Sequence, residues 1–257
     1  MFDSLKGKVA LVTGGTKGIG KAIADKLSAN GALVVITART EANDTAGSHH
    51  FIATDHTQAD SAGCIAREIL EKYGKIDIIV NNAGANSSPG GGFSTLEDED
   101  WFRDWELNFR SVVRINKALL PAMLEQKEGT IINISTGAAK QPIWEMTMSY
   151  SSAKAALNAY SKALANELGP KGIRVNTVSP GVVKTPLMHE FIENIAQQSG
   201  SSFEDSFQNI IDKVGVPVGR MAEPEEVASI VAFLASSEAR YITGTNISVD
   251  GGASPTV

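Results

Sequence analysis

The stretch KVALVTGGTKGIG, residues 8–20, decides the fold of this chain. An apolar strand pattern at 8–13 runs into a glycine-rich turn, and AIADKLSANG after the turn carries an apolar stripe at helical spacing. Glycines in this setting let the backbone turn tightly and let a pyrophosphate reach the N–H groups at the start of a helix. The turn therefore predicts a dinucleotide site, although its Gly14-x-x-x-Gly18-x-Gly20 spacing leaves a purely structural turn open as an alternative.

The rest of the chain continues this alternation of short apolar runs and helical patterns. Runs rich in Val, Ile and Leu that are separated by helices are typical of a parallel sheet covered on both faces. The sequence therefore predicts an α/β fold, a doubly wound parallel sheet of Rossmann type in three α/β/α layers. The expected strands lie at 8–13, 32–37, 50–54, 77–81, 130–135, 173–179 and 245–249, and the expected helices at 18–29, 61–73, 98–126, 149–168 and 224–236.

Length and rhythm predict a single dinucleotide-binding and catalytic domain over residues 1–257. The segment NSSPGGG at 86–92 is predicted to be a flexible loop, because the strand–helix rhythm resumes after it. Residues 186–218 interrupt that rhythm with two short helical patterns and no strand, which predicts an inserted substrate lid.

The composition is that of an ordinary globular protein, with 42% hydrophobic and 20% charged residues. A net charge of −6 without a basic cluster argues against nucleic acid and acidic membrane surfaces as partners. The single cysteine, Cys64, fits a reducing cytosol and is predicted to be a small core residue. Because the N-terminus lacks a signal pattern and no apolar run is long enough to span a bilayer, we expect a cytoplasmic protein.

The end of the second predicted strand indicates which dinucleotide is bound. NAD-binding proteins usually place an acid about 20 residues after the glycines, where it binds the ribose 2′-hydroxyl. Here the strand ends in TART (37–40), without an acid at its tip. The guanidinium of Arg39 suits a 2′-phosphate and Lys17 adds a second positive charge, unless both are solvated surface cations. We therefore expect NADP(H) to be preferred over NAD(H). The predicted contacts of this region are Gly14, Thr16, Lys17, Gly18, Ile19, Gly20, Arg39 and Thr40.

Tyr150 and Lys154 are candidates for catalysis. They lie four residues apart in SYSSAKAALNAYSKALANEL (149–168), so on a helix they share one face. A phenol has a pKa of about 10, and a nearby ammonium is expected to lower that pKa toward the working range of an acid/base. Because Tyr-x-x-x-Lys is common by chance, the pair alone also fits a solvated helix face.

Seven short motifs follow one another along nearly the whole chain. They are TGGTKGIG (13–20), NNAG (81–84), Asn108 in WELNFRS, GTIINIST (129–136), YSSAK (150–154), SPGVVKT (179–185) and YITGTNISVDGG (241–252). In this order and spacing they resemble the short-chain dehydrogenase/reductase family, in its single-domain branch.

The resemblance implies roles for individual residues. Tyr150 would be the acid/base that protonates the carbonyl oxygen in reduction, while Lys154 would lower its pKa and hold the nicotinamide ribose. Asn108 would kink its helix and hold a water that links Lys154 to solvent. Asp55 would meet the adenine amino group, with the His56 backbone beside it. Further cofactor contacts would come from Asn82, Ala83 and Gly84 on the adenosine side and from Pro180, Gly181, Val183 and Thr185 at the nicotinamide.

One position departs from the family pattern. The family's substrate-orienting serine closes a G-x-h-h-x-h-x-S string, where h is apolar, and counted from Gly129 that place falls on Thr136. A threonine hydroxyl donates the same hydrogen bond, although its β-methyl narrows the approach. We expect Thr136 to orient the carbonyl and keep Ser135, one residue earlier, as the alternative.

Other features are given structural roles. The four histidines lack Cys, Asp or Glu at ligand spacing, so no metal site is expected. The acidic run at 97–100 precedes an apolar helical pattern and is predicted to cap that helix. Trp101 and Trp105 are predicted to lie in the core or at a subunit contact. The resemblance implies that the helices containing Asn108 and Tyr150 form such a contact, so a homotetramer is expected.

The substrate pocket is expected between residues 86–95, 137–149 and 186–213. Its side chains are apolar, partly aromatic and partly methionine, which suits a ketone or secondary alcohol on a hydrophobic skeleton. Lys140 is the one nearby cation that would suit an acidic substrate. The predicted lining residues are Ile143, Trp144, Met146, Met148, Leu187, Met188 and Phe191.

The sequence thus predicts an NADP(H)-dependent oxidoreductase that interconverts a ketone and a secondary alcohol. A 3-oxoacyl-thioester reductase is the alternative within this class, and it would need a basic patch at the pocket mouth for an acyl carrier protein or coenzyme A. A non-catalytic NADP-sensing module is disfavoured by intact Tyr150, Lys154 and Asn108. A sugar-nucleotide epimerase is disfavoured because about 70 residues after Gly181 leave little room for a substrate domain.

Overall fold

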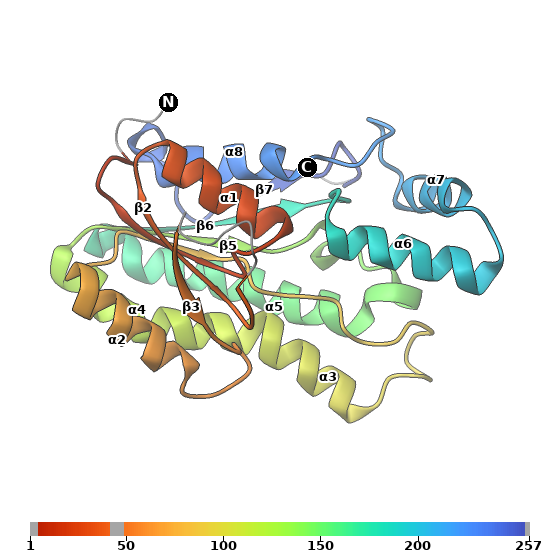
Figure 1. The fold of residues 1–257 in the computed structure, drawn as a ribbon, viewed down its shortest axis with the longest axis horizontal. Helices are drawn as coiled ribbons and strands as arrows, with labels where there is room; N and C mark the ends of the chain where they lie inside the picture. Colours follow the sequence, from red (N-terminus) through yellow and green to blue (C-terminus); the bar gives the residue numbers. More distant parts are fainter. Residues whose placement is uncertain (1–4, 42–48, 255–257) are drawn as a thin grey trace.

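Seven parallel strands form one sheet in the order β3-β2-β1-β4-β5-β6-β7. They belong to a computed structural model that describes residues 5–41 and 49–254 (Figure 1). All seven predicted strands are present within about one residue of their expected bounds. The strands are β1 Val9–Thr13, β2 Leu33–Ala38, β3 His50–Ala53, β4 Ile78–Asn81, β5 Gly129–Ile134, β6 Ile173–Pro180 and β7 Asn246–Val249.

Helices cover both faces of the sheet, so the three-layer, doubly wound fold is confirmed (Figure 1). Successive side chains of a strand point to opposite faces. Ala10 and Val12 of β1 accordingly pack toward α1 and α8, whereas Val9 and Leu11 pack toward α2, α4 and α5. The helices are α1 Gly18–Ala29, α2 Ser61–Tyr73, α3 Asp98–Trp105, α4 Ser111–Gln126, α5 Trp144–Leu168, α6 Pro186–Ser199, α7 Phe203–Val214 and α8 Pro224–Ala235.

The strand order reverses between β1 and β4, which are neighbours in the sheet although β2 and β3 separate them in the chain. In open α/β sheets a ligand binds in the crevice outside the carboxyl ends of the strands at such a reversal. The glycine turn after β1 and the NNAG motif after β4 both lie at this edge. The fold therefore brings two of the predicted cofactor segments together.

The helix predicted at 98–126 is divided into α3, a π-helical turn at Glu106–Arg110, and α4. Helix α5, which contains Tyr150 and Lys154, begins at Trp144, five residues before its expected start at 149. Its first turn is supported by Thr147, whose hydroxyl accepts a hydrogen bond from the Ile143 N–H at 3.2 Å. The predicted capping of α3 is confirmed: the side chains of Glu97 and Asp100 form a reciprocal capping box.

The prediction that Cys64 is a core residue is wrong. The buried stripe of α2 consists of Ala62, Ile65, Ala66 and Ile69, which recur at helical spacing. Cys64 lies outside this stripe and is exposed. Periodicity placed the helix correctly. The face of Cys64 was predicted only from the apolar character of its thiol, and that argument was wrong.

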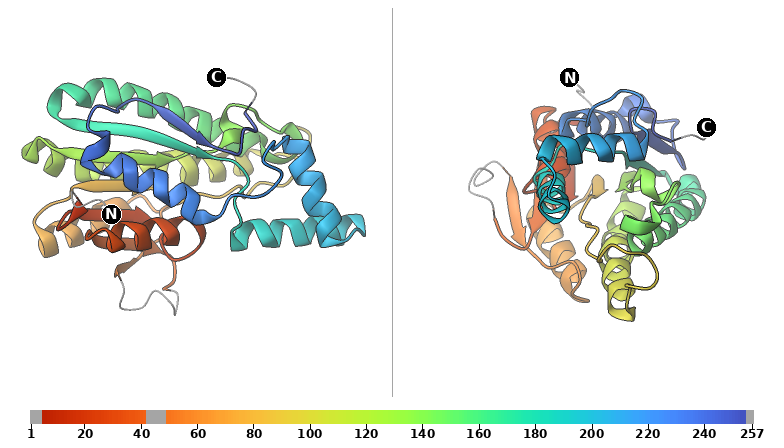
Figure 2. Two further views of the ribbon diagram at one scale, coloured as in Figure 1. Left: turned by 90° about the horizontal axis from the view of Figure 1, so that it is seen from above. Right: turned by 90° about the vertical axis from the view of Figure 1, so that its right-hand side faces the viewer.

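The two helical patterns predicted at 186–218 form α6 and α7, which project beyond the carboxyl edge of the sheet (Figure 2). Thr185 begins α6, its hydroxyl accepting a hydrogen bond from the Met188 N–H at 3.1 Å. Ser202 caps α7 in the same way through the Asp205 N–H at 3.0 Å. Among the described residues, no helix combines the length and the apolar character that crossing a bilayer requires.

Candidate active site

The glycine turn has the shape that a pyrophosphate needs. Gly14 and Gly18 adopt positive φ angles of 67° and 54°, which side chains disfavour. A Cβ on Gly20 would lie 2.1 Å from the Gly14 carbonyl oxygen, so this crossing admits no side chain. Helix α1 begins at Gly18 with neither a side-chain cap nor an acid in its first turn. Its N–H groups therefore point out of the turn and suit the phosphates of a dinucleotide.

Thr13 fastens the two strands at the reversal, a role that the sequence prediction missed. Its hydroxyl accepts hydrogen bonds from the N–H groups of Asn82 and Ala83, both at 2.9 Å. The Asn82 amide in turn donates to the carbonyl oxygens of Thr13 at 2.9 Å and Gly14 at 3.2 Å. The predicted residues Asn82 and Ala83 therefore hold the glycine turn in place. A threonine that ends a strand directly before a glycine turn was the available signal.

The region expected to hold the adenosine 2′ group presents unpaired positive charge. Arg39 and Lys17 are exposed, and neither forms an ion pair with another described residue. Asp55 accepts hydrogen bonds from the Thr57 N–H and hydroxyl, which lower the pKa of its carboxyl. His56 is buried, and burial lowers its pKa to about 4, so it is neutral. Thr40, the remaining predicted contact here, is exposed beside Arg39.

Lys154 is a buried ammonium at the carboxyl edge of the sheet. Its side chain is 3% exposed, and its Nζ donates to the carbonyl oxygen of Ile134 at 2.8 Å. The same Nζ lies 5.9 Å from the centre of the Tyr150 ring. A Cβ on Gly84 would come within 3.1 Å of that Nζ and within 2.7 Å of Asn108 Oδ1. The glycine of NNAG is therefore needed for the close approach of these two side chains.

Burial sets the protonation of both catalytic candidates. It lowers the pKa of Lys154 to about 8 and raises the pKa of Tyr150 to about 12. A hydrogen bond with the Thr136 hydroxyl partly offsets the rise for Tyr150, and the Asp104 carboxylate adds to it. The expectation that Lys154 lowers the pKa of Tyr150 is not tested by this balance and stays a prediction. The loss of hydration dominates, and the ammonium donates to Ile134 instead of to the phenol.

Thr136 and Ser135 occupy different surroundings at the end of β5. The Thr136 hydroxyl accepts a hydrogen bond from the Ala138 N–H at 3.2 Å and lies near enough to the Tyr150 hydroxyl to lower its pKa. The Ser135 hydroxyl is buried, and within the described part of the chain it has no hydrogen-bond partner. Of the two, Thr136 therefore lies beside the phenol, and its role in orienting the carbonyl stays a prediction.

Asn108 lies inside the π-helical turn, where the expected kink occurs. Its Oδ1 accepts from the Ala85 N–H at 3.1 Å, and its Nδ2 donates to the carbonyl oxygens of Ala85 at 2.8 Å and Asp104 at 3.0 Å. It is fully buried. The side chain thus joins the helix to the segment after NNAG, and its role in holding a water stays a prediction.

The segment after β6 lies against the glycine turn. A Cβ on Gly18 would lie 3.2 Å from the Thr185 Cγ2. Val183 is buried and pairs with Ala222 in a short parallel bridge. The residues predicted to contact the nicotinamide, Pro180, Gly181, Val183 and Thr185, therefore lead from the edge of the sheet into the base of α6.

The three segments predicted to line the substrate pocket do converge. The Asn86 amide donates to the Met146 carbonyl at 2.8 Å, and a Cβ on Gly92 would lie 2.9 Å from the Trp144 ring. On the other side, Lys213 of α7 pairs with Glu145 of α5 at 3.1 Å. Of the predicted lining residues, Trp144 is 59% and Leu187 49% exposed, while Ile143, Met146, Met148, Met188 and Phe191 are half-buried.

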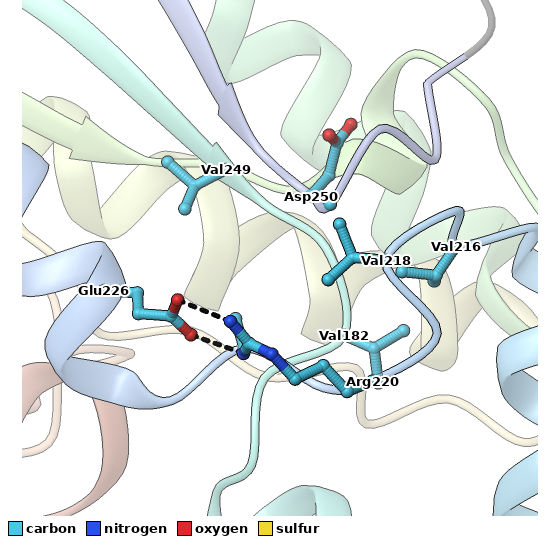
Figure 3. A pocket seen from close by; sticks show the side chains of 9 residues that line it. Val182, Val216, Val218, Arg220, Glu226, Val249 and Asp250 are labelled. Carbon is cyan, nitrogen blue, oxygen red and sulfur yellow. Dashed lines mark hydrogen bonds and ion pairs between the residues drawn. The ribbon is translucent and has the colours of Figure 1, made fainter.

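A separate small pocket of about 130 Å³ lies among the segments that follow β6 and α7 and the end of β7 (Figure 3). Valine side chains form much of its wall, and Arg220 beside them makes a two-pronged ion pair with Glu226 at 2.7 and 2.9 Å. Its lining includes neither Tyr150 nor Lys154. Because the guanidinium is already paired, we assign this pocket a structural role. Within the described ranges, no three His, Cys, Asp or Glu side chains are grouped as metal ligands.

Comparison with known proteins gives a consistent result. A family model described as "Enoyl-(Acyl carrier protein) reductase" matches residues 14–254. The 3-oxoacyl-(acyl-carrier-protein) reductase of Haemophilus influenzae is 38% identical, over 96% of this chain and 98% of its own. A putative ketoacyl reductase of the monensin polyketide synthase from Streptomyces virginiae is 37% identical, over 95% and 96%. L-Sorbose reductase from Gluconobacter frateurii, solved with NADPH and L-sorbose, superposes with a TM-score of 0.93 at 33% identity and full coverage of both chains.

The chain belongs to the short-chain dehydrogenase/reductase family. The resemblance drawn from the seven motifs is thereby confirmed. Membership makes the protein an oxidoreductase that acts on CH–OH and C=O groups with a nicotinamide cofactor. The residues predicted for its site, Tyr150, Lys154, Thr136 and Asn108, lie near one another at the carboxyl edge of the sheet.

Proposed function

We propose that this protein is an NADP(H)-dependent oxidoreductase that interconverts a ketone and a secondary alcohol on a mainly hydrophobic substrate. One observation carries the proposal. The Tyr150 hydroxyl lies near the Thr136 hydroxyl, which lowers its pKa, while the Lys154 ammonium lies beside Gly84 on the same edge of the sheet as the glycine turn. An acid (Tyr150), a hydrogen-bond donor (Thr136) and a fixed positive charge (Lys154) thus lie together at the edge of the sheet where we expect the nicotinamide of a bound cofactor.

The cofactor is held, in this proposal, by the glycine turn and the segments around it. The N–H groups at the start of α1 bind the pyrophosphate, and Arg39 with Lys17 binds the 2′-phosphate that distinguishes NADP from NAD. Both cations are exposed and form no ion pair among the described residues, although the Asp55 carboxylate lies near enough to Arg39 to interact with it electrostatically. The L-sorbose reductase relative was solved with NADPH, which supports the same preference.

In the proposed mechanism Thr136, Tyr150 and Lys154 each have one role. When bound, the nicotinamide would supply the hydride that the carbonyl carbon receives. Thr136 donates a hydrogen bond to the carbonyl oxygen, and Tyr150 gives that oxygen its proton as negative charge develops. With its pKa raised to about 12, Tyr150 is protonated at neutral pH, which is the form that reduction requires. Lys154, charged below its pKa of about 8, stabilises the phenolate that remains.

A 3-oxoacyl-thioester reductase is the second candidate, because the Haemophilus influenzae relative carries that name. Such an enzyme needs positive charge at the mouth of the site to meet an acidic carrier. In the described structure, Lys184 pairs with Glu223, Lys213 with Glu145 and Arg220 with Glu226. Lys140 is exposed and, among the described residues, donates to Ser248 at 3.3 Å without an acidic partner. The pairing of three of these four cations favours a free ketone over a carrier-bound thioester.

We also propose a cytoplasmic homo-oligomer, with a homotetramer as the expected form. Three aromatic side chains of α3 support a subunit contact, since Trp101 is 38%, Phe102 66% and Trp105 39% exposed. Light scattering on the purified protein tests this proposal. A mass equal to that of a single 27.1 kDa chain would contradict it.

The deciding experiment is a panel of carbonyl compounds followed at the NADPH absorbance band, with NADH run beside it. The panel contains apolar cyclic and acyclic ketones, a ketose and acetoacetyl thioesters. The Tyr150→Phe variant is expected to bind NADPH as the wild type does and to lose nearly all turnover. A fully active variant would refute the role of Tyr150, and turnover restricted to the thioesters would favour the second candidate.

A further inference from the structure

Asp104 of α3 holds a carboxylate that is completely buried. Burying a carboxylate is costly unless it is paired with a cation or fully hydrogen-bonded. No Lys, Arg or His of the described residues forms an ion pair with it, and its partners are three serines. Oδ1 accepts from the Ser87 N–H at 3.2 Å and the Ser87 hydroxyl at 2.8 Å, and Oδ2 accepts from the hydroxyls of Ser88 at 2.7 Å and Ser149 at 2.5 Å.

These serines come from two parts of the site that are far apart in the sequence. Ser87 and Ser88 open the 86–92 loop, which packs on Trp144 and Met146. Ser149 directly precedes Tyr150 in α5, and its hydroxyl also lies 2.9 Å from that of Ser88. One carboxylate therefore joins α3, the loop beside the substrate and the turn that carries the catalytic phenol.

We propose that Asp104 is a positioning residue of this enzyme, which fastens the 86–92 loop to the turn of α5 that carries Tyr150. The inference rests on the function proposed for Tyr150. Asp104 itself, being wholly buried, touches neither substrate nor cofactor in this assignment. Its effect reaches the site through Ser87, Ser88 and Ser149, whose hydroxyls donate hydrogen bonds to its carboxylate.

Besides positioning these segments, Asp104 acts electrostatically on Tyr150 through its charge. Around Tyr150, α5 contributes the positive Lys154 and α3 the negative Asp104, whereas Thr136 after β5, Asn108 in the π-helical turn and the two serines of the loop are uncharged. The Asp104 carboxylate opposes ionisation of the phenol and so raises its pKa. It thereby favours the proton-donating form of Tyr150, which is the form used in reduction.

Asp104→Asn tests the charge while keeping the size of the side chain. The pH profile of alcohol oxidation, which needs the phenolate, is expected to move down by about one pH unit. At a fixed pH below the pKa, that shift means roughly tenfold more phenolate. Asp98→Asn is the matched control, since it makes the same change of charge at an exposed position in the first turn of α3. It is expected to leave the profile unchanged.

Ser149→Ala tests the positioning, because it cuts the link to α5 and keeps the charge. We expect a severalfold loss of kcat with the pH profile in place, and faster amide hydrogen exchange over 86–92. An Asp104→Asn enzyme with the wild-type profile, or a Ser149→Ala enzyme with wild-type kcat and exchange, would overturn the inference.

A readout that needs no turnover separates this inference from the proposed function. Tyrosine labelled with ¹³C at Cζ reports the ionisation of each of the four tyrosines by NMR, and Tyr150→Phe assigns the signal of Tyr150. In Asp104→Asn that signal is expected to titrate at lower pH than in the wild type. If it does so in a protein that reduces no ketone, the proposed function fails while the role of Asp104 stands; if it does not move, the role of Asp104 fails.

Discussion

Replacing Lys154 by methionine is expected to make the protein more stable near neutral pH while abolishing its activity. Burial lowers the pKa of this ammonium from 10.5 to about 8. At about 1.4 kcal/mol per pKa unit, keeping the charge inside the native protein costs about 3 kcal/mol. The neutral thioether of Met fills a similar space without that cost. In the variant the carbonyl oxygen of Ile134 loses its hydrogen-bond donor, which reduces the gain in stability by about 1 to 2 kcal/mol.

The pH dependence of the difference is the sharper part of the prediction. Between the native pKa of about 8 and the unfolded value of 10.5, the unfolded chain binds more protons than the native one. The free energy of unfolding of the wild type therefore gains from this group as the pH rises through that window. Below pH 8 the penalty is present in full. The advantage of the Met variant is thus expected to shrink by about 2 to 3 kcal/mol between pH 7 and pH 10.

Urea unfolding of both proteins at pH 7, 8, 9 and 10, followed by circular dichroism, measures this difference directly. The Lys171→Met variant is a suitable control, because Lys171 is exposed and forms a surface ion pair with Glu167 at 3.2 Å. Its difference from the wild type is expected to be small at every pH. A Lys154→Met protein less stable than the wild type at pH 7, or an offset that does not vary with pH, would refute the burial argument.

Four further substitutions test other parts of the site. Thr136→Ala is expected to lower kcat by about two orders of magnitude, as for the loss of one oxyanion donor, whereas Ser135→Ala leaves it near wild type; the reverse ranking would reassign the donor. Arg39→Asp should weaken NADPH use far more than NADH use, and equal losses in kcat/KM would overturn the 2′-phosphate assignment. Gly20→Ala places a Cβ 2.1 Å from the Gly14 oxygen, so urea unfolding should show a loss of about 2 kcal/mol or more, together with weaker binding of both dinucleotides.

Periodicity and the motifs were sufficient for the sheet and for the segments of the site. All seven strands followed from apolar runs and their spacing, and the resemblance carried by the seven motifs implied that Tyr150, Lys154 and Asn108 share one site. The π-helical turn was not predicted, because the 3.6-residue pattern runs through 98–126 without a break. The exposed Cys64 was missed because residue type alone was taken to decide its face.

The protonation states of Tyr150 and Lys154 could not be predicted from the sequence, for a different reason. Tyr150 and Lys154 at helical spacing suggested an ammonium that acts directly on a phenol, and the sign of the resulting pKa change followed from that pairing. The structure adds two quantities that raise the pKa of Tyr150. One is the burial of the hydroxyl, and the other is a carboxylate from α3 that no local pattern connects with Tyr150. Both depend on how three distant segments pack.

Two buried charges without direct ion partners among the described residues flank the phenol: an ammonium on α5 and a carboxylate on α3. Each alone would destabilise the fold, and neither neutralises the other through contact. Proteins break the rules of stable burial mainly where function requires it. Here the opposite charges act on the same equilibrium in opposite directions, since Asp104 favours the phenol that gives the proton and Lys154 favours the phenolate that remains. The pKa of Tyr150, and with it the pH range in which the residue can give or take the proton, is therefore set by both charges together, and removing either one is expected to shift it.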